Sequence, residues 1–210
     1  KYTTGHGMTG TCLVLTTPDA ERTMNTCLSI SSNFSIKNIN LVDLKNSEYL
    51  YIEGYLVTSN VAMEAVHKSI EFSHENDVKI ALTFSDLAMV KYFKDNFKLI
   101  LNKKVDLLFC NEDEAKTFSG YDTLEDSIKH LGKLTSILAI TLGKNGSLIY
   151  HNGEKIIIDP YPTKAVDTVG AGDTFAGAFL YGITNGLSLK KSGDLASLLS
   201  SKVVSKIGPR

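Results

Sequence analysis

The sequence predicts an α/β fold in which a mostly parallel central sheet carries helices on both faces. β-rich apolar runs alternate with longer helical stretches along most of the chain, an order typical of strands joined by helical crossovers. The run at 105–110, VDLLFC, is nearly all apolar, as expected of a strand that is covered on both faces. With 210 residues, of which 43% are hydrophobic, the chain can bury one substantial core.

The first elements along the chain form a predicted hairpin. Residues 11–16 and 22–29 are β-rich, and the segment Pro18-Asp19-Ala20 between them is typical of a turn. We therefore expect two antiparallel strands here, ahead of the alternating part of the chain.

The middle of the chain alternates strands with helices. Apolar strands bounded by turn residues are predicted, in order, at 49–52, 78–84, 105–110 and 137–142. Helical stretches are predicted at 60–74, 86–101 and 124–132, with a further helix beginning at Asn111-Glu112. Because parallel neighbours need crossover connections, this region is expected to form the parallel part of the sheet.

The C-terminal part of the chain adds a second hairpin and two closing helices. Residues 146–150 and 155–158 are split by Asn152-Gly153, a dipeptide that favours a tight β-turn. The closing helices are predicted at 173–185 and 189–207. No internal repeat or linker interrupts the pattern.

Composition excludes several classes of partner. A net charge of −1 gives no basis for binding nucleic acid or an anionic membrane. No apolar run reaches the ~18 residues that span a bilayer, and the first residues lack the apolar core of a signal peptide. The cysteines Cys12, Cys27 and Cys110 lack metal-ligand spacing, so we expect buried free thiols in a reducing cytoplasm.

Three polar segments follow predicted strands or open a helix at the carboxyl edge of the sheet, where ligands of such sheets bind. They contain Asn111, Glu112 and Glu114; Thr141, Gly143 and Gly146; and Gly170 to Asp173. Alone, each has a plain structural interpretation as a helix cap, a turn between strands or a helix-starting aspartate. Together they favour a site for phosphoryl transfer from a nucleotide. The first segment offers ligands for hydrated Mg²⁺, the second a glycine-rich surface for the nucleotide, and the third an anion pocket that contains an acidic residue.

The turn Gly170-Ala171-Gly172-Asp173 carries the chemistry of this prediction. Successive small residues let several backbone N–H groups point into one space at a helix N-terminus, where they and the helix dipole bind anions. An acidic side chain is unfavourable for anion binding alone. Asp173 is therefore interpreted as a group that accepts a proton beside a phosphate.

The order of these motifs resembles the ribokinase-like, or PfkB, family of carbohydrate and nucleoside kinases. The motifs are Asn-x-x-Glu from Asn111, Thr-x-Gly-x-x-Gly from Thr141, and Asp-Thr-x-Gly-Ala-Gly-Asp from Asp167. No Gly-Lys-Ser/Thr follows the glycines, so this is not a Walker P-loop. Looser matches resemble the adenosine kinase branch: TGTC at 9–12 with ERTM at 21–24, and VDLLFCNEDEA at 105–115. The resemblance covers most of the chain and implies a ribokinase-like fold.

For catalysis, the resemblance implies that Asp173 is the general base that takes the proton from the acceptor hydroxyl. The turn formed by Gly170, Ala171 and Gly172 would shape an anion hole for the charge that builds on the transferred phosphate. Its donors would be the N–H groups of Ala171, Gly172 and Asp173, and such donors supply the dominant electrostatic contribution to catalysis of this kind.

For the cofactors, the resemblance implies ATP and Mg²⁺, with Asn111 and Glu114 holding the metal and phosphates mainly through water. Asp167 would help to bind K⁺ beneath the anion hole; since position 169 is valine, any ligand there would be a backbone carbonyl. Residues that would border the adenine-nucleotide groove or touch the phosphate chain are Thr141, Gly143, Gly146 and Thr168.

The resemblance also assigns a lid. Residues 1–30 would form part of a β lid over the acceptor, and residues 31–210 the nucleotide-binding and catalytic core. Arg22 on this hairpin would reach the transferring phosphate when the lid closes; the alternative is a surface arginine paired with Glu21 or Asp19. The exposed edge of the hairpin is where we expect a homodimer to form.

The function implied is ATP-dependent phosphoryl transfer to a primary hydroxyl of a sugar or nucleoside, with adenosine as the favoured acceptor. The alternative is a non-catalytic nucleotide-binding or regulatory module of the same fold. In this family, the residues that bind the acceptor lie in an N-terminal portion that this sequence does not represent. Direct contacts in this sequence therefore do not identify the acceptor.

Overall fold

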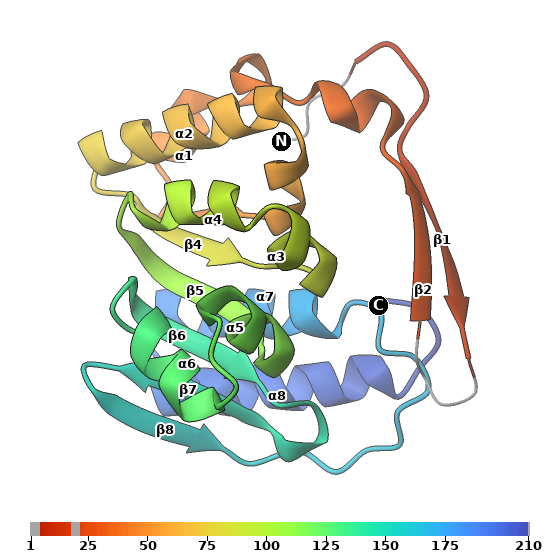
Figure 1. The fold of residues 1–210 in the computed structure, drawn as a ribbon, viewed down its shortest axis with the longest axis vertical. Coiled ribbons are helices and arrows are strands. Elements are labelled where there is room, and N and C mark those ends of the chain that lie inside the picture. Colours follow the sequence, from red (N-terminus) through yellow and green to blue (C-terminus); the bar gives the residue numbers. More distant parts are fainter. Residues whose placement is uncertain (1–4, 18–21, 210) are drawn as a thin grey trace.

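The computed structural model, which describes residues 5–17 and 22–209, contains a six-stranded sheet and a separate two-stranded sheet (Figure 1). The strands of the larger sheet lie side by side in chain order. They are β3 (Tyr49–Ile52), β4 (Lys79–Thr83), β5 (Val105–Asn111), β6 (Thr135–Thr141), β7 (Ser147–His151) and β8 (Glu154–Ile158). From β3 to β6 the neighbours are parallel, whereas β7 and β8 are antiparallel, so the sheet is mostly parallel as the sequence predicts.

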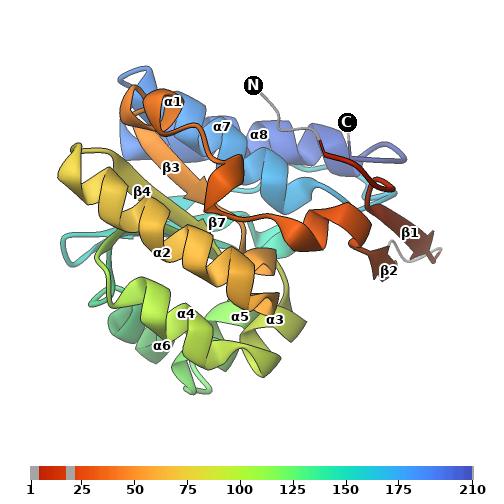
Figure 2. The same cartoon turned by 90° about the horizontal axis from the view of Figure 1, so that it is seen from above.

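Helices cover both faces of this sheet. Because parallel strands β3 to β6 follow one another in one direction, their right-handed crossovers all leave on the same side. Figure 2 shows α2 to α6 on that side and α7 and α8 on the other. The helices are α1 (Leu41–Lys45), α2 (Asn60–Glu75), α3 (Leu87–Tyr92), α4 (Lys94–Leu101), α5 (Glu112–Ser119), α6 (Leu124–Leu131), α7 (Ala171–Thr184) and α8 (Leu189–Val204).

Each face of the sheet has its own hydrophobic core. Successive residues of a strand point to opposite faces, so β4 sends Leu82 toward α2 to α6 and Ala81 toward α7 and α8. Phe109 of β5 lies on the α7 side, where its ring packs against Phe175 and Phe179 with centroid distances of 6.4 and 5.7 Å. The side chains at the carboxyl edge are therefore divided between two faces, and those on the α7 side meet the start of α7.

The predicted N-terminal hairpin forms a sheet of its own, made of β1 (Thr11–Thr16) and β2 (Arg22–Cys27). It stands beside the larger sheet in Figure 1. In the described residues no second layer covers this ribbon, and Leu13 and Leu15 are 63% and 55% exposed. The expectation of buried thiols is therefore wrong for Cys12 and Cys27, which are exposed, and is confirmed for Cys110.

Several element boundaries differ from the predicted ones. The stretch 86–101 is two helices, α3 and α4, separated at Phe93, whose backbone leaves the helical region at φ −124° and ψ 26°. No proline or glycine marks this break in the sequence. The short helix α1 was not predicted, and α8 ends at Val204 rather than 207. Among the described residues, no helix has the length and apolar character needed to cross a membrane.

Candidate active site

The candidate site begins at the turn that opens α7. Gly170 is the N-cap residue and has a left-handed backbone with φ 77°. A Cβ atom at this position would lie 2.7 Å from Cβ of Pro209. Glycine is therefore required here by both the backbone conformation and the close approach of the C-terminal turn.

The first N–H groups of α7 point away from the body of the helix. Within the described part of the chain, the N–H of Thr174 donates to the carbonyl of Gly170 at 2.9 Å, and the N–H of Ala171 donates to the carbonyl of Thr168 at 3.3 Å. The N-cap residue, Gly170, has no side chain with which to cap this helix. The N–H groups of Gly172 and Asp173 are thus left for a partner outside the helix, and the space around the Gly172 Cα is open. This combination suits an anion.

Asp173 lies in the first turn of α7 and is exposed. Partial burial raises the pKa of Glu53 at the end of β3, and the charge of Asp173 raises it further. The charge of Asp173 thus acts on a group at the carboxyl end of β3.

Asn111 and Glu114 form a capping box at the start of α5. Oδ1 of Asn111 accepts the N–H of Glu114 at 2.8 Å, and Oε2 of Glu114 accepts the N–H of Asn111 at 2.9 Å. Glu114 is only 5% exposed. Burial and then the Glu114 charge raise the pKa of the neighbouring Cys110 thiol. The plain structural interpretation of this motif, a helix cap, is thus present in the fold.

The same pair has the oxygen chemistry that Mg²⁺ prefers, one carboxylate and one amide. Mg²⁺ keeps several waters and is held by one or two carboxylates together with substrate phosphates. Among the described residues, no three His, Cys, Asp or Glu side chains gather as a metal site. The Asn111–Glu114 pair offers one carboxylate and one amide, which fits a hydrated Mg²⁺ that takes its other ligands from phosphates and water.

The predicted nucleotide ledge lies next to this pair. Thr141 at the end of β6 pairs with Asn111 of β5 in the parallel register, so the two segments are neighbours at the edge. Gly143 and Gly146 flank a 3-10 turn that leads into β7, with φ 56° and 88°. At Gly146 a Cβ would lie within van der Waals overlap of the Ile158 carbonyl oxygen. The turn interpretation of these glycines is therefore correct, and it leaves an exposed surface at Gly143.

Asp167 connects the loop before α7 to the turn at Gly208 near the C-terminus by hydrogen bonds. It is buried, and its two carboxylate oxygens accept the N–H groups of Val169 and Gly208, each at 2.9 Å. Thr168 follows it and supplies the carbonyl that accepts from Ala171. This negative group beneath the α7 turn has the oxygen chemistry that a monovalent cation needs.

Two further side chains lie on the α7 side of this edge, and the sequence motifs did not indicate them. Tyr51 of β3 packs edge-on against Phe109 with a centroid distance of 6.4 Å. Glu53 follows two residues later, on the same face by strand alternation, directly after the end of β3. A signal was available, namely an acidic residue followed by Gly54 at the carboxyl end of a predicted strand.

Arg22 is the first residue of β2, opposite Thr16. Its side chain, like Asp19 and Glu21, lies outside the described residues. The hairpin that carries it is nevertheless placed next to the main body on the side of the C-terminal turn (Figure 1).

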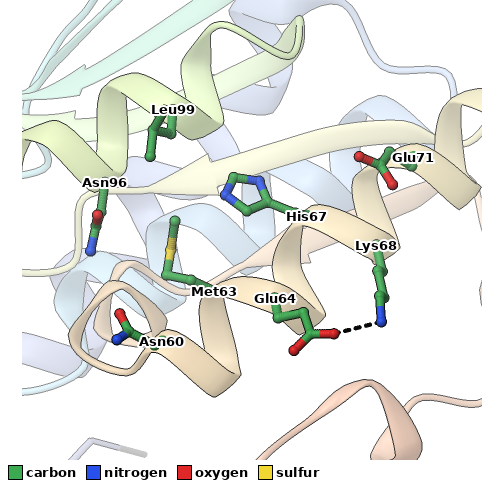
Figure 3. A pocket seen from close by; sticks show the side chains of 8 residues that line it. All are labelled: Asn60, Met63, Glu64, His67, Lys68, Glu71, Asn96 and Leu99. Atoms are coloured by element: carbon green, nitrogen blue, oxygen red, sulfur yellow. Dashed lines mark hydrogen bonds and ion pairs between the residues drawn. The ribbon is translucent and has the colours of Figure 1, made fainter.

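A groove of about 460 Å³ lies elsewhere, between α2 and α4 (Figure 3). The ring of His67 points into it, and burial followed by the Lys103 charge lowers the pKa of this histidine. Since α2 and α4 cover the face of the sheet opposite α7, this groove is separate from the site around Asp173 (Figure 2).

Comparisons with known proteins agree with this fold. Residues 2–210 match the family described as pfkB family carbohydrate kinase. A ribokinase from Lactococcus lactis is 36% identical over 138 residues, which cover 59% of this chain and 45% of the relative. An ATP-dependent 6-phosphofructokinase from Thermoanaerobacterium thermosaccharolyticum is 28% identical over 174 residues, which cover 79% and 52%. The chain thus spans about half the length of these curated relatives.

A solved structure is similar over almost the whole chain. The crystal structure of adenosine kinase from Sinorhizobium meliloti has a TM-score of 0.94 and 30% sequence identity, and the match covers 98% of this chain and 64% of that one. The fold is therefore ribokinase-like, as the resemblance implied. Since the family match runs through nearly the whole sequence and accompanies this fold, the chain belongs to the pfkB family of carbohydrate kinases.

Proposed function

We propose that this protein is an ATP-dependent kinase that transfers the γ-phosphoryl group to a primary hydroxyl of a sugar or nucleoside. The observation that carries the proposal is the start of α7. There an exposed carboxylate, Asp173, lies beside N–H groups that have no helical partner, at the edge of the sheet that also bears Asn111 and Glu114.

In the proposed reaction, the acceptor oxygen attacks the γ-phosphorus while its proton passes to the carboxylate of Asp173. The bond from the γ-phosphorus to the bridging oxygen breaks, and ADP leaves with that oxygen. The N–H groups of Gly172 and Asp173 donate to the oxygens of the transferring group, with Ala171 completing the turn that Gly170 begins. Loss of one such donor typically costs about 3 kcal/mol of transition-state stabilisation.

The cofactors of the proposal follow from the neighbouring segments. Bound Mg²⁺ supplies charge neutralisation on the phosphates, and Asn111 and Glu114 would hold it through water. Thr141, Gly143 and Gly146 border the nucleotide, and Thr168 lies beside the phosphate chain. Asp167 beneath the anion hole would assist a K⁺ ion.

The remaining parts of the proposal concern the lid and the acceptor. Residues 1–30 form a lid on the core of residues 31–210, and Arg22 neutralises charge on the transferring phosphate when the lid closes. Adenosine is the favoured acceptor, supported by the adenosine kinase from Sinorhizobium meliloti at 30% identity. A ribokinase and a phosphofructokinase at 36% and 28% identity support sugar acceptors as competitors. The free thiols suit a reducing cytoplasm.

The test is the variant Asp173→Asn, assayed in whichever length of the protein transfers phosphate. Removing a general base typically costs 10²–10⁴-fold in rate, so we expect roughly that loss in ADP release with unchanged ATP binding. Asp122→Asn, in the exposed loop before α6, is the matched control and should leave both unchanged. Candidate acceptors are adenosine, other nucleosides, ribose, fructose and phosphorylated sugars, each with Mg²⁺ and with or without K⁺.

Full turnover by Asp173→Asn would contradict the assignment of the base. ATP binding with no release of ADP for any acceptor would instead support the non-catalytic nucleotide-binding module. The two results are distinguished by measuring nucleotide binding and product formation on the same preparation.

A further inference from the structure

The helices α7 and α8 pack side by side, and the end of α8 returns to the segment that leads into α7 (Figure 2). At one end of the pair, a Cβ on Gly182 of α7 would lie 2.6 Å from Oγ of Ser192 of α8. At the other end, the N–H of Val166 donates to the carbonyl of Val204 at 2.8 Å. The last turns of α8 therefore lie against the start of α7, where the anion hole is proposed.

Ser200 of α8 makes a direct contact with this start. Its Oγ donates to the carbonyl oxygen of Ala171, the first residue of α7, at 3.1 Å. A serine inside a helix commonly donates to a carbonyl of its own helix three or four residues earlier, and Ser201 does so with Leu198 at 2.8 Å. The two neighbouring serines thus differ in their partners, because the hydroxyl of Ser200 is directed across the helix pair.

The carbonyl of Ala171 and the N–H of Gly172 belong to one peptide unit. This unit is planar and trans, so its oxygen and its hydrogen point in opposite directions. A carbonyl oxygen has two lone pairs, and a regular helix uses one of them for the N–H four residues later. Ser200 supplies a second donor, which restricts the orientation of the whole unit and therefore of the N–H of Gly172. Hydrogen bonds at the two ends of a peptide unit also polarise one another, by roughly 10–30% per bond.

We propose that Ser200 is a positioning residue for phosphoryl transfer, acting through the Ala171–Gly172 peptide unit to orient and polarise the N–H of Gly172. This role rests on the proposed function, in which that N–H donates to an oxygen of the transferring phosphoryl group. Ser200 does not contact the phosphate itself, because its hydroxyl binds the opposite end of the peptide unit. It adds a group from α8 to a site whose other parts precede that helix in the chain.

Other contacts hold the turn in place without Ser200. The N–H of Ala171 donates to the carbonyl of Thr168 at 3.3 Å, and the carbonyl of Gly170 accepts the N–H of Thr174 at 2.9 Å. Asp167 accepts the N–H of Val169 at 2.9 Å. These contacts act on other peptide units than the one between Ala171 and Gly172. Loss of the Ser200 hydroxyl should therefore alter one donor of the anion hole and leave the turn folded.

The kinetic test compares three variants in whichever length of the protein transfers phosphate. In Ser200→Ala the N–H of Gly172 is less well oriented toward charge that develops in the transition state, so kcat should fall roughly fivefold with KM for ATP little changed. Ser200→Thr retains a hydroxyl and should recover most of the wild-type kcat. Ser201→Ala is the matched control, since it removes a hydroxyl from the same helix and should leave kcat unchanged.

A second measurement does not depend on kinase activity. The protein is labelled with ¹⁵N-glycine, and the amide signal of Gly172 is assigned by its loss in Gly172→Ala. A hydrogen bond to the carbonyl of a peptide unit changes the electron distribution at its nitrogen, so this signal should move in Ser200→Ala and stay in place in Ser201→Ala. Titration with inorganic phosphate should shift the Gly172 amide of the wild type, and Ser200→Ala should need a several-fold higher phosphate concentration for the same shift.

The role of Ser200 and the kinase function can fail separately. If Asp173→Asn inactivates the enzyme while Ser200→Ala keeps the wild-type kcat and phosphate affinity, the role of Ser200 is refuted and the kinase stands. If Ser200→Ala moves the Gly172 signal and weakens phosphate binding in a protein that phosphorylates no acceptor, the kinase assignment is refuted and the positioning of this N–H stands. A Gly172 amide that does not respond to phosphate in the wild type overturns both. A merely structural Ser200 would lower the melting temperature as Ser201→Ala does, without changing kcat or phosphate affinity.

Discussion

At the scale of single residues, the glycines of the α7 turn have different physical requirements. Gly170 has a left-handed backbone, and a Cβ there would meet Pro209 at 2.7 Å. Gly172 lies in the helix with open space around the position of a Cβ. The sequence shows two similar glycines, and only the three-dimensional structure distinguishes Gly170, which the fold requires, from Gly172, which borders the space proposed for phosphate.

Gly170→Ala and Gly172→Ala should therefore have opposite effects on stability. Alanine at 170 is expected to destabilise by about 1–2 kcal/mol from the left-handed backbone alone, plus the contact with Pro209. Alanine at 172 should stabilise the helix by about 0.5–1 kcal/mol while its methyl group slows phosphoryl transfer. The measurements are the free energy of unfolding in urea and the rate of ADP release.

Gly177→Ala is the control for this pair. Gly177 also lies in α7, is exposed and has open space around it, but it is a full turn further from the site. It should gain stability without losing activity. Equal loss of activity in Gly172→Ala and Gly177→Ala would show that the space at Gly172 has no special role.

Individual residues also show which parts of the site the sequence motifs miss. The positions of Asp173, Asn111 and Thr141 follow from spacing within short segments and were predicted. Tyr51 joins the site because its side chain packs on the face of the sheet that α7 covers, and Glu53 because it follows the end of β3 where the charge of Asp173, 120 residues later, acts on it. The sequence shows an acidic residue before Gly54 at the end of a predicted strand, but its nearness to the start of α7 depends on tertiary packing.

At the scale of elements, α5 combines a structural role with a proposed catalytic one. Its capping box uses the side chains of Asn111 and Glu114, the same two groups that the kinase proposal assigns to Mg²⁺. A substitution that removes both roles at once cannot tell them apart. A glutamine at 114 can, because its carbonyl oxygen can still accept the N–H of Asn111 while the negative charge is lost.

Glu114→Gln is accordingly expected to change the melting temperature little and to raise the Mg²⁺ concentration needed for half-maximal activity roughly tenfold, as typical for loss of a metal-orienting group. Thr123→Ala is the comparison, since Thr123 caps α6 through the N–H of Asp126. It should cost about 1 kcal/mol of stability and leave the Mg²⁺ requirement unchanged. A Mg²⁺ requirement that is identical in Glu114→Gln and wild type would contradict the metal role.

The elements themselves were predictable to different degrees. β1, β3 and the start of α2 follow the sequence pattern because apolar periodicity and turn residues agree there. The division between α3 and α4 could not be predicted, because no proline or glycine marks the break at Phe93 in the sequence. β5 ends one residue later than predicted, and β6 begins two residues earlier and ends one residue earlier, because pairing between the two strands, which is non-local, sets their bounds.

At the scale of the whole molecule, the two sheets differ in how they are stabilised. The larger sheet is buried between two helical layers, whereas the β1–β2 ribbon exposes Leu13 and Leu15. An isolated two-stranded ribbon is marginally stable in water. The homodimer is expected at the exposed edge of this hairpin, and packing of two ribbons from two copies of the chain would also bury these leucines.

Leu15→Lys should therefore convert a dimer to a monomer without lowering the stability of the core, because this side chain lies outside both core clusters. Sedimentation velocity over a range of protein concentrations measures the first effect, and thermal unfolding measures the second. Val42→Lys is the control, since Val42 is 68% exposed on α1, away from the ribbon. A wild-type protein that is monomeric at every concentration would exclude the dimer.

The arrangement of helices has a consequence for synthesis on the ribosome. All strands of the larger sheet and one helical layer precede Ala171, while the other layer is α7 and α8. Until these two helices emerge, Leu107, Phe109 and Ala139 on that face have nothing to cover them. A nascent chain at this stage exposes one apolar face of its sheet, so chaperone binding and degradation should act most strongly before α7 and α8 have left the ribosome.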